Sequence, residues 1–129
     1  MVPTHLRRDE AELAIIRTIA ASHGDAAVVM MNLNLYTPEA GYADGVLYRQ
    51  YMAQLRALLG QVGARILWQI PVYGQVVGDG RIDEILAVLY PTHQAFLDLT
   101  SADGAQESYR LRGLCVARAV IHRCASFPV

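Results

Sequence analysis

VGARILWQIPVYGQVVGDGRIDEILAVLYPTHQAF, residues 62–96, is the stretch that decides the fold. Two apolar runs, 64–77 and 82–90, flank the turn sequence Gly78-Asp79-Gly80. This pattern predicts a β-hairpin, because glycine permits the positive φ angles that tight connections between strands require. Pro71 lies inside the first run and indicates a bulge or an edge position, because proline cannot donate a hydrogen bond to a neighbouring strand.

Helices are predicted on both sides of this hairpin. An amphipathic pattern predicts an N-terminal helix over 5–21 and a second, stronger helix over 46–62. The apolar stripe of the second helix consists of Tyr48, Tyr51, Leu55, Leu58 and Val62. Thr92 is a typical N-cap, so a short helix is expected to about residue 99, and a further helix is expected over 105–114.

Two more strands are predicted, at 28–36 and at 118–124. The first reads VVMMNLNLY, with one wholly apolar face and with Asn32 and Asn34 together on the other. The resulting order of strand, helix, strand, strand, helix, strand predicts an α+β protein of ferredoxin-like βαββαβ topology. Its four-stranded antiparallel sheet would carry the helices on one face, with the N-terminal helix as an addition. A second copy of the chain, related by a two-fold axis, is expected to cover the bare face.

The composition is consistent with one domain over residues 1–129, with its core at about 27–125. An apolar fraction of 53% is above the usual range, and the surplus is expected to line a homodimer interface. No apolar run approaches the roughly 20 residues that span a bilayer, and charges interrupt the N-terminus where a signal peptide would be apolar. We therefore expect a cytoplasmic protein without membrane contact, in which Cys115 and Cys124 are free thiols.

The charged residues exclude several function classes. The net charge is −1 and the positive side chains are spread along the chain, which argues against nucleic acid as a partner. All 11 cationic side chains are arginine, so chemistry that needs a lysine, such as Schiff-base formation, is excluded. No nucleotide-binding fingerprint, Cys-x-x-Cys pair or His-x-x-x-His pair is present, and neither a cofactor nor a metal ion is expected.

The chain resembles the bacterial domain of unknown function family 1330, within the dimeric α/β barrel superfamily. The segments that carry the resemblance are VVMMNLNLY, LYRQYMAQLRALLGQVGARILW, IDEILAVLYPTHQAFL and AVIH, between about Ala27 and Cys124. The resemblance implies a ferredoxin-like protomer and a homodimer, and it brings no catalytic mechanism. The chain departs from the family pattern over 104–112, so no family site residue is carried over there.

Four residues are candidates for substrate binding. Tyr51 and Trp68 either fill the core or line a pocket for a flat, apolar ligand. Asn32 and Asn34 are unusual in a central strand, because asparagine is depleted in strands. They either orient a substrate or stabilise an oxyanion, or they form a polar row that meets water or an interface.

His122 and Tyr48 are the candidate catalytic residues. His122 is suited to be a general base, because the pKa of histidine is ordinarily near neutrality, although a lone histidine in a strand is often structural. Tyr48 either orients a carbonyl or phenolic substrate or packs in the core. His93 is expected to face solvent. Asp83 and Glu84 are adjacent in a strand and are therefore expected to point to opposite faces, where they cannot act as a pair.

Two hypotheses about function follow. The protein is a cofactor-independent enzyme of the cyclase, isomerase or monooxygenase type that acts on a small aromatic or polyketide-like molecule. Alternatively, it is a non-catalytic small-molecule-binding protein or a structural homodimer module, in which the same residues serve packing.

Overall fold

The computed structural model describes residues 6–127, and its elements follow the predicted order. The strands and helices are α1 (Glu10–Ala20), β1 (Val28–Tyr36), α2 (Val46–Gln61), β2 (Arg65–Pro71), β3 (Glu84–Tyr90), α3 (His93–Asp98), α4 (Ala105–Cys115) and β4 (Val116–Ala125), with short 3-10 turns at Pro38–Ala40 and Leu99–Ser101. The antiparallel sheet has the order β2-β3-β1-β4. This is the ferredoxin-like α+β fold that the sequence predicts.

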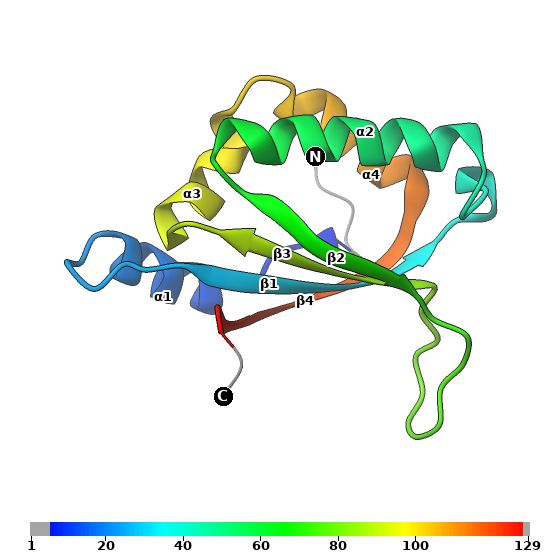
Figure 1. Ribbon diagram of the computed structural model, residues 1–129, viewed down its shortest axis with the longest axis horizontal. Helices are drawn as coiled ribbons and strands as arrows, with labels where there is room; N and C mark the ends of the chain where they lie inside the picture. Colours follow the sequence, from blue (N-terminus) through cyan, green and yellow to red (C-terminus); the bar gives the residue numbers. More distant parts are fainter. Residues whose placement is uncertain (1–5, 128–129) are drawn as a thin grey trace.

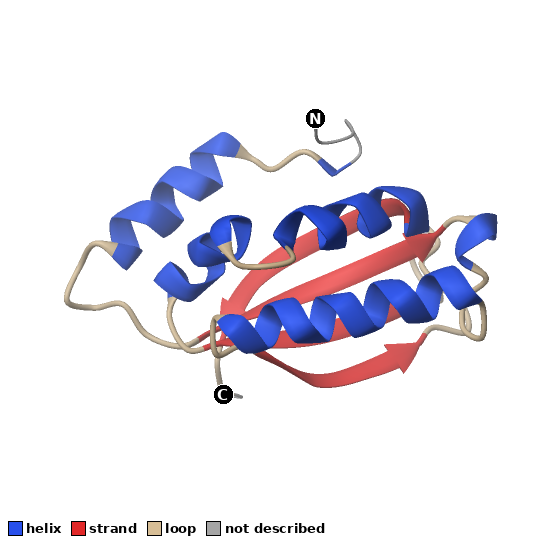
Figure 2. Cartoon of the chain, turned by 90° about the horizontal axis from the view of Figure 1, so that it is seen from above, coloured by secondary structure: helices blue, strands red, loops and turns tan. Residues whose placement is uncertain are grey.

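The helices cover one face of the sheet and leave the other face bare (Figure 1). Seen from above, α2 and α4 lie over the sheet and run roughly along its strands, with α1 near the margin beside α3 (Figure 2). The predicted stripe of α2 is confirmed, since Tyr48, Tyr51 and Leu58 are buried in the core. Asp9 caps α1 by accepting a hydrogen bond from the Glu12 N–H at 2.9 Å, so this helix begins later than the sequence predicts.

The two faces of β1 have opposite surroundings. Val28, Met30 and Tyr36 belong to the core beneath the helices, and strand alternation places Asn32 and Asn34 on the same side. The wholly apolar row of β1 therefore faces the bare side of the sheet. Its members are Val29, Met31, Leu33 and Leu35.

The predicted hairpin is shorter than its apolar runs. β2 ends at Pro71 and β3 begins at Glu84, so residues 72–83 form a long loop with Gly78-Asp79-Gly80 in it. The prediction of a strand over 72–77 was wrong. This segment is rich in apolar residues, but it has no neighbouring strand to pair with and therefore forms part of the loop. Pro71 lies in an edge strand as expected, whereas the register shift falls between Ile66 and Trp68.

His93 is buried, at 7% exposure, which corrects the expectation that it faces solvent. The carboxylate of Asp25 accepts hydrogen bonds from the His93 backbone N–H at 2.7 Å and the Gln94 N–H at 3.1 Å, and its Oδ1 lies 3.0 Å from the His93 ring Nδ1. Burial alone would raise the pKa of Asp25, but these hydrogen bonds outweigh it and lower the pKa below its ordinary value of 3.8. Asp25 thus ties the segment before β1 to the start of α3.

Replacing Asp25 by alanine is expected to lower the free energy of unfolding by about 1–2 kcal/mol at neutral pH, as for loss of a helix cap. Because the folded pKa is depressed, this stabilisation is present above the unfolded pKa and disappears as the pH falls through the folded value. Urea denaturation at neutral and at strongly acidic pH measures the difference, with Asp44→Ala on an exposed loop as the control. A deficit that is the same at both pH values would contradict this assignment.

Candidate functional site

A cavity of about 290 Å³ lies between the helices and the covered face of the sheet. Its walls are mostly apolar, and side chains that form them include Leu13, Ile16, Met30, Leu58, Leu86 and Phe96. Small-molecule sites are concave and mostly apolar with a few converging polar groups, and this cavity is near the lower end of their usual range of about 300–1,000 Å³. The cavity is therefore of a size for a small ligand.

Phenol and guanidinium groups converge on one part of the cavity. Tyr51, Tyr90 and Tyr109 contribute hydroxyls, and Arg8 and Arg112 contribute positive charges. Burial raises the pKa of both Tyr51 and Tyr90, while the charge of Arg112 acts in the opposite direction on each of them. At neutral pH the phenols of Tyr51 and Tyr90 are therefore protonated and can donate hydrogen bonds.

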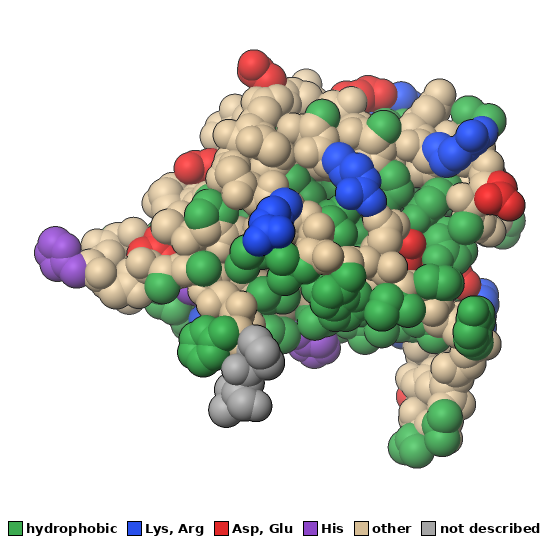
Figure 3. Space-filling view, in the orientation of Figure 1, with side chains coloured by type: hydrophobic (Ala, Val, Ile, Leu, Met, Phe, Trp, Pro, Cys, Tyr) green, Lys and Arg blue, Asp and Glu red, His purple; other side chains and the backbone are tan. Residues whose placement is uncertain are grey.

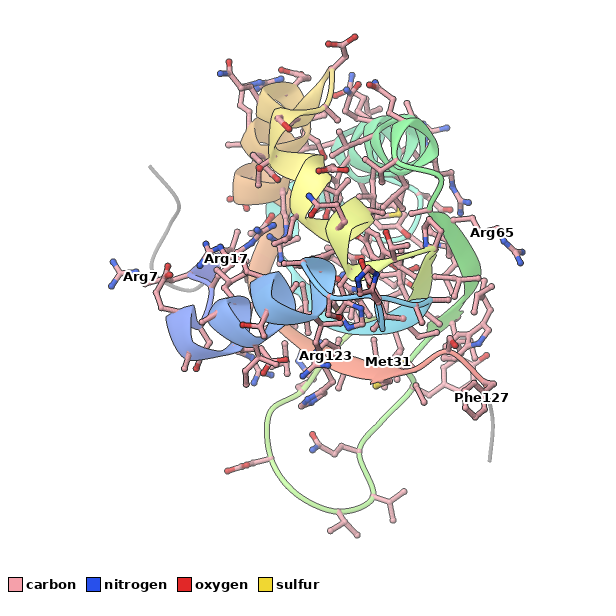
Figure 4. All side chains as sticks on the ribbon, turned by 90° about the vertical axis from the view of Figure 1, so that its left-hand side faces the viewer. Arg7, Arg17, Met31, Arg65, Arg123 and Phe127 are labelled. Carbon is pink, nitrogen blue, oxygen red and sulfur yellow. The ribbon has the colours of Figure 1, made fainter. Side chains whose placement is uncertain are left out.

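Three other charged residues of the lining have partners of their own: Arg123, Glu12 and Asp9. Arg123 donates from Nε to Glu12 Oε1 at 2.5 Å, and Asp9 caps α1. Arg7 is exposed and points away from the molecule, whereas Arg123 lies beside α1 (Figure 4). Arg8 lies over the ring of Phe96, 5.1 Å from its centroid. The cavity therefore has an excess of positive charge.

Three of the predicted binding residues line this cavity. Tyr51, Asn32 and Asn34 are brought together there from α2 and β1. The Asn32 side chain donates to the Met30 carbonyl at 3.0 Å, and buried Asn34 donates to the Tyr36 hydroxyl at 3.3 Å. The two asparagines are thus on the covered face and have partners within the protomer.

Tyr48 belongs to a separate network, centred on Glu84, which is only 2% exposed. Glu84 Oε1 accepts from the Tyr36 hydroxyl at 2.5 Å, and Oε2 accepts from the Tyr48 hydroxyl at 2.7 Å. The side-chain amide of Gln69 also donates to Oε2, at 3.0 Å. Both oxygens accept hydrogen bonds, which is the arrangement of an ionised carboxylate. Reasoning from the sequence missed this role of Glu84, although a lone acid at the start of the apolar strand EILAVLY was a usable signal.

Aromatic rings surround this carboxylate. Tyr42 stacks on Tyr36 at a centroid distance of 5.0 Å and meets Tyr48 edge-on at 4.9 Å. Burial is the main cause that raises the pKa of these phenols, and the negative charge of Glu84 adds to it; the pKa of Tyr42 is raised to about 12. Asp83 lies just before β3 and not within the strand as predicted, and its carboxylate accepts a hydrogen bond from the Tyr36 backbone N–H at 2.9 Å.

Trp68 and His122 lie on the bare face of the sheet, so the candidate substrate-binding and catalytic residues do not share one pocket. They are the two ends of one row across all four strands, Trp68–Ala87–Met31–His122. Trp68 is 42% exposed and His122 is exposed, so neither packs in the core of the protomer. His122 and Tyr48 are separated by the sheet and cannot act on the same molecule within one protomer. The sequence alone could not assign these faces, because it does not say which side the helices cover.

Within residues 6–127, no three His, Cys, Asp or Glu side chains are grouped so that they could hold a metal ion. Cys115 and Cys124 are both free cysteines. None of the helices over the same residues has the length and apolar character needed to cross a bilayer.

The fold matches two crystal structures of a protein of unknown function. One is RPA0582 from Rhodopseudomonas palustris, with a TM-score of 0.77 and 20% sequence identity over 98% of this chain and 100% of that chain. The other is methylated RPA0582, with the same TM-score and identity over 96% of each chain. No protein-family model and no curated protein sequence matches the chain. The likeness confirms the fold.

Replacing Tyr36 by phenylalanine is expected to lower the free energy of unfolding by about 1.5–3 kcal/mol, the usual worth of a hydrogen bond to a charged group. The ring is kept, so packing against Tyr42 is preserved while Glu84 loses one of its donors. Urea denaturation measures the change, and Tyr73→Phe, on the exposed 72–83 loop, is the matched control. An unfolding free energy equal to that of the control would show that Glu84 does not depend on this donor.

Proposed function

We propose that the protein is a cytoplasmic homodimer of the dimeric α/β barrel type, related to family 1330, that binds a small molecule in the cavity of each protomer. The observation that carries this proposal is the cavity itself, with its apolar walls and converging phenol and guanidinium groups.

The bare face of the sheet supports the dimer. Besides the apolar row of β1, β2 contributes Trp68 and Ile70, and β4 contributes Val120. Figure 3 shows hydrophobic side chains gathered along the sheet region and at the tip of the loop that projects below it. An apolar surface of this kind is rare on monomers, and a two-fold axis would cover it with an identical face.

The 72–83 loop supports the same partner. It projects on the bare side of the sheet (Figure 1), and its residue Val76 is fully exposed. Arg118 of β4 holds the base of the loop by donating to the Arg81 carbonyl at 2.5 Å. Between the loop and the sheet is a hollow of about 570 Å³, bordered by Leu33, Tyr73 and Val120. Side chains of a second copy would occupy this hollow and cover the exposed loop residues.

Replacing Met31 by arginine in the centre of the bare face is expected to convert the dimer into a monomer, because the charge would be buried without a partner. Light scattering should then fall from about twice the chain mass of 14.2 kDa to that mass. Gln50→Arg, which adds the same charge on the exposed side of α2, should remain dimeric. A wild-type chain that is monomeric at micromolar concentration would overturn the dimer.

Replacing Val76 and Val77 together by aspartate should weaken the dimer without unfolding the protomer, because both side chains are exposed within the chain. The dimer dissociation constant is expected to rise by at least about tenfold, as for the loss of two buried valine side chains. Sedimentation over a dilution series measures it. An unchanged dissociation constant would show that the loop does not contact the second copy.

Binding is favoured over catalysis because the described lining of the cavity offers no free general base. Asp9 and Glu12 have partners, and no histidine of residues 6–127 lines the cavity. A cofactor-independent enzyme on a small aromatic or polyketide-like molecule is the second candidate. It is supported by the phenols and guanidiniums, which can stabilise negative charge that develops on a substrate oxygen.

A fragment screen by ligand-observed NMR tests the binding function directly. Ala119 lies on β4 in the cavity lining, so Ala119→Phe should fill part of the cavity and abolish the binding of the hits. Thermal melting of the same variant confirms that it is folded. Hits that bind the folded variant and the wild type equally would place the ligand outside the cavity and would overturn the proposal.

A further inference from the structure

We infer that the ligand of the cavity is a small organic carboxylate with an apolar body, bound through its carboxylate by Arg112 and Arg8. This inference rests on the proposed binding function and names the chemical class of the ligand.

The charge of the cavity requires a negative partner. Of the cationic side chains in the lining, Arg123 pairs with Glu12, and Arg7 is exposed. Arg112 and Arg8 are half-buried, and neither has a carboxylate partner among residues 6–127. The contact of Arg112 is with the hydroxyl of Tyr51, which is neutral. Guanidinium groups withdrawn from water are usually paired with an anion, and a carboxylate suits their planar donors in bidentate geometry.

The hydrogen-bonding groups beside these arginines are donors as well. The Tyr109 hydroxyl is buried and has no hydrogen-bond partner among the described residues. Tyr51, Tyr90 and Tyr109 interact electrostatically with one another or with Arg112, so these groups are close together. Protonated phenols and guanidiniums together offer O–H and N–H groups that need acceptors. A carboxylate provides acceptor oxygens and no donor, which complements this set.

The walls of the cavity favour an organic acid over an inorganic anion. The lining also includes the side chains of Leu13, Ile16, Met30 and Leu86, which offer no hydrogen bond to a phosphate ion. An apolar body on the ligand would bury against these side chains and gain the hydrophobic free energy that a bare anion cannot. The volume of about 290 Å³ limits that body to a small aromatic ring or a short aliphatic chain.

The test compares acids with their neutral amides by isothermal titration of the intact chain. The probes are phenylacetate and hexanoate, their amides phenylacetamide and hexanamide, and inorganic phosphate. We expect the acids to bind about 10- to 100-fold more tightly than the amides, the worth of hydrogen bonds to a charged group. Phosphate should bind more weakly than either acid.

Two variants locate the carboxylate. Arg112→Met keeps an unbranched side chain and should reduce acid affinity by about 10- to 100-fold while leaving the amides unchanged. Arg110→Met is the matched control on the same helix, because Arg110 is exposed and pairs with Glu107 at 2.7 Å outside the cavity. Tyr109→Phe is the second variant and replaces Arg112→Met if that protein is unfolded. The Tyr109 hydroxyl has no hydrogen-bond partner among the described residues, so its removal should not lower the melting temperature. The affinity for the acids should nevertheless fall several-fold.

Each result decides one of the two claims. If acids and amides bind equally and Ala119→Phe prevents both from binding, the ligand is not recognised through its carboxylate. The proposed binding function would then still hold. Phosphate that binds as tightly as the acids and displaces them would assign the site to inorganic anions. Acids that bind Arg112→Met as they bind the wild type would overturn the inference, as would acids that do not bind at millimolar concentration. If the fragment hits also bind Ala119→Phe as tightly as the wild type, the proposed binding function is wrong as well.

Discussion

The packing of the sheet against α2 depends on the hydrogen bonds to the buried carboxylate of Glu84. Its donors are Tyr36 from β1, Tyr48 from α2 and Gln69 from β2. A buried charge without its partners costs several kilocalories per mole, so any shift in register among these elements would be strongly disfavoured. The network therefore specifies how the strands and the helix fit together, in addition to the apolar contacts that hold them. The hydroxyls of Tyr36 and Tyr48 already donate to Glu84, so they are not available to donate to a substrate.

The cavity lies beside this network, and Asn34 belongs to both. Its side chain donates to Tyr36, and it also borders the cavity. Tyrosine serves two purposes in the protomer: Tyr36 and Tyr48 satisfy a carboxylate of the chain itself, whereas Tyr109 has a buried hydroxyl without a partner among the described residues. This difference between satisfied and unsatisfied donors is the physical basis for placing the ligand in the cavity and not at Glu84.

The two faces of the sheet have separate roles in the proposals. The covered face carries the asparagines, the Glu84 network and the cavity, while the bare face carries Trp68 and His122 in one row. In the proposed dimer this row would meet the partner sheet, so a histidine that looks like a general base in the sequence would lie in an interface. The chemistry of a residue type is thus decided by its surroundings, because burial and partners set what a side chain can donate, accept or exclude.

The sequence by itself determined the order of the elements, the ferredoxin-like topology, the buried stripe of α2 and the unequal faces of β1. These features follow from local periodicity, which a short window of residues contains. The tertiary structure decided the rest: that the asparagine row faces the helices, that His122 and Trp68 lie opposite Tyr48, and that residues 72–83 are a loop. It also decided that Arg8, from before α1, lines the same cavity as Arg112 and Tyr109 of α4. Such convergence depends on contacts between residues far apart in the chain, and no local pattern encodes which distant side chains will share one cavity.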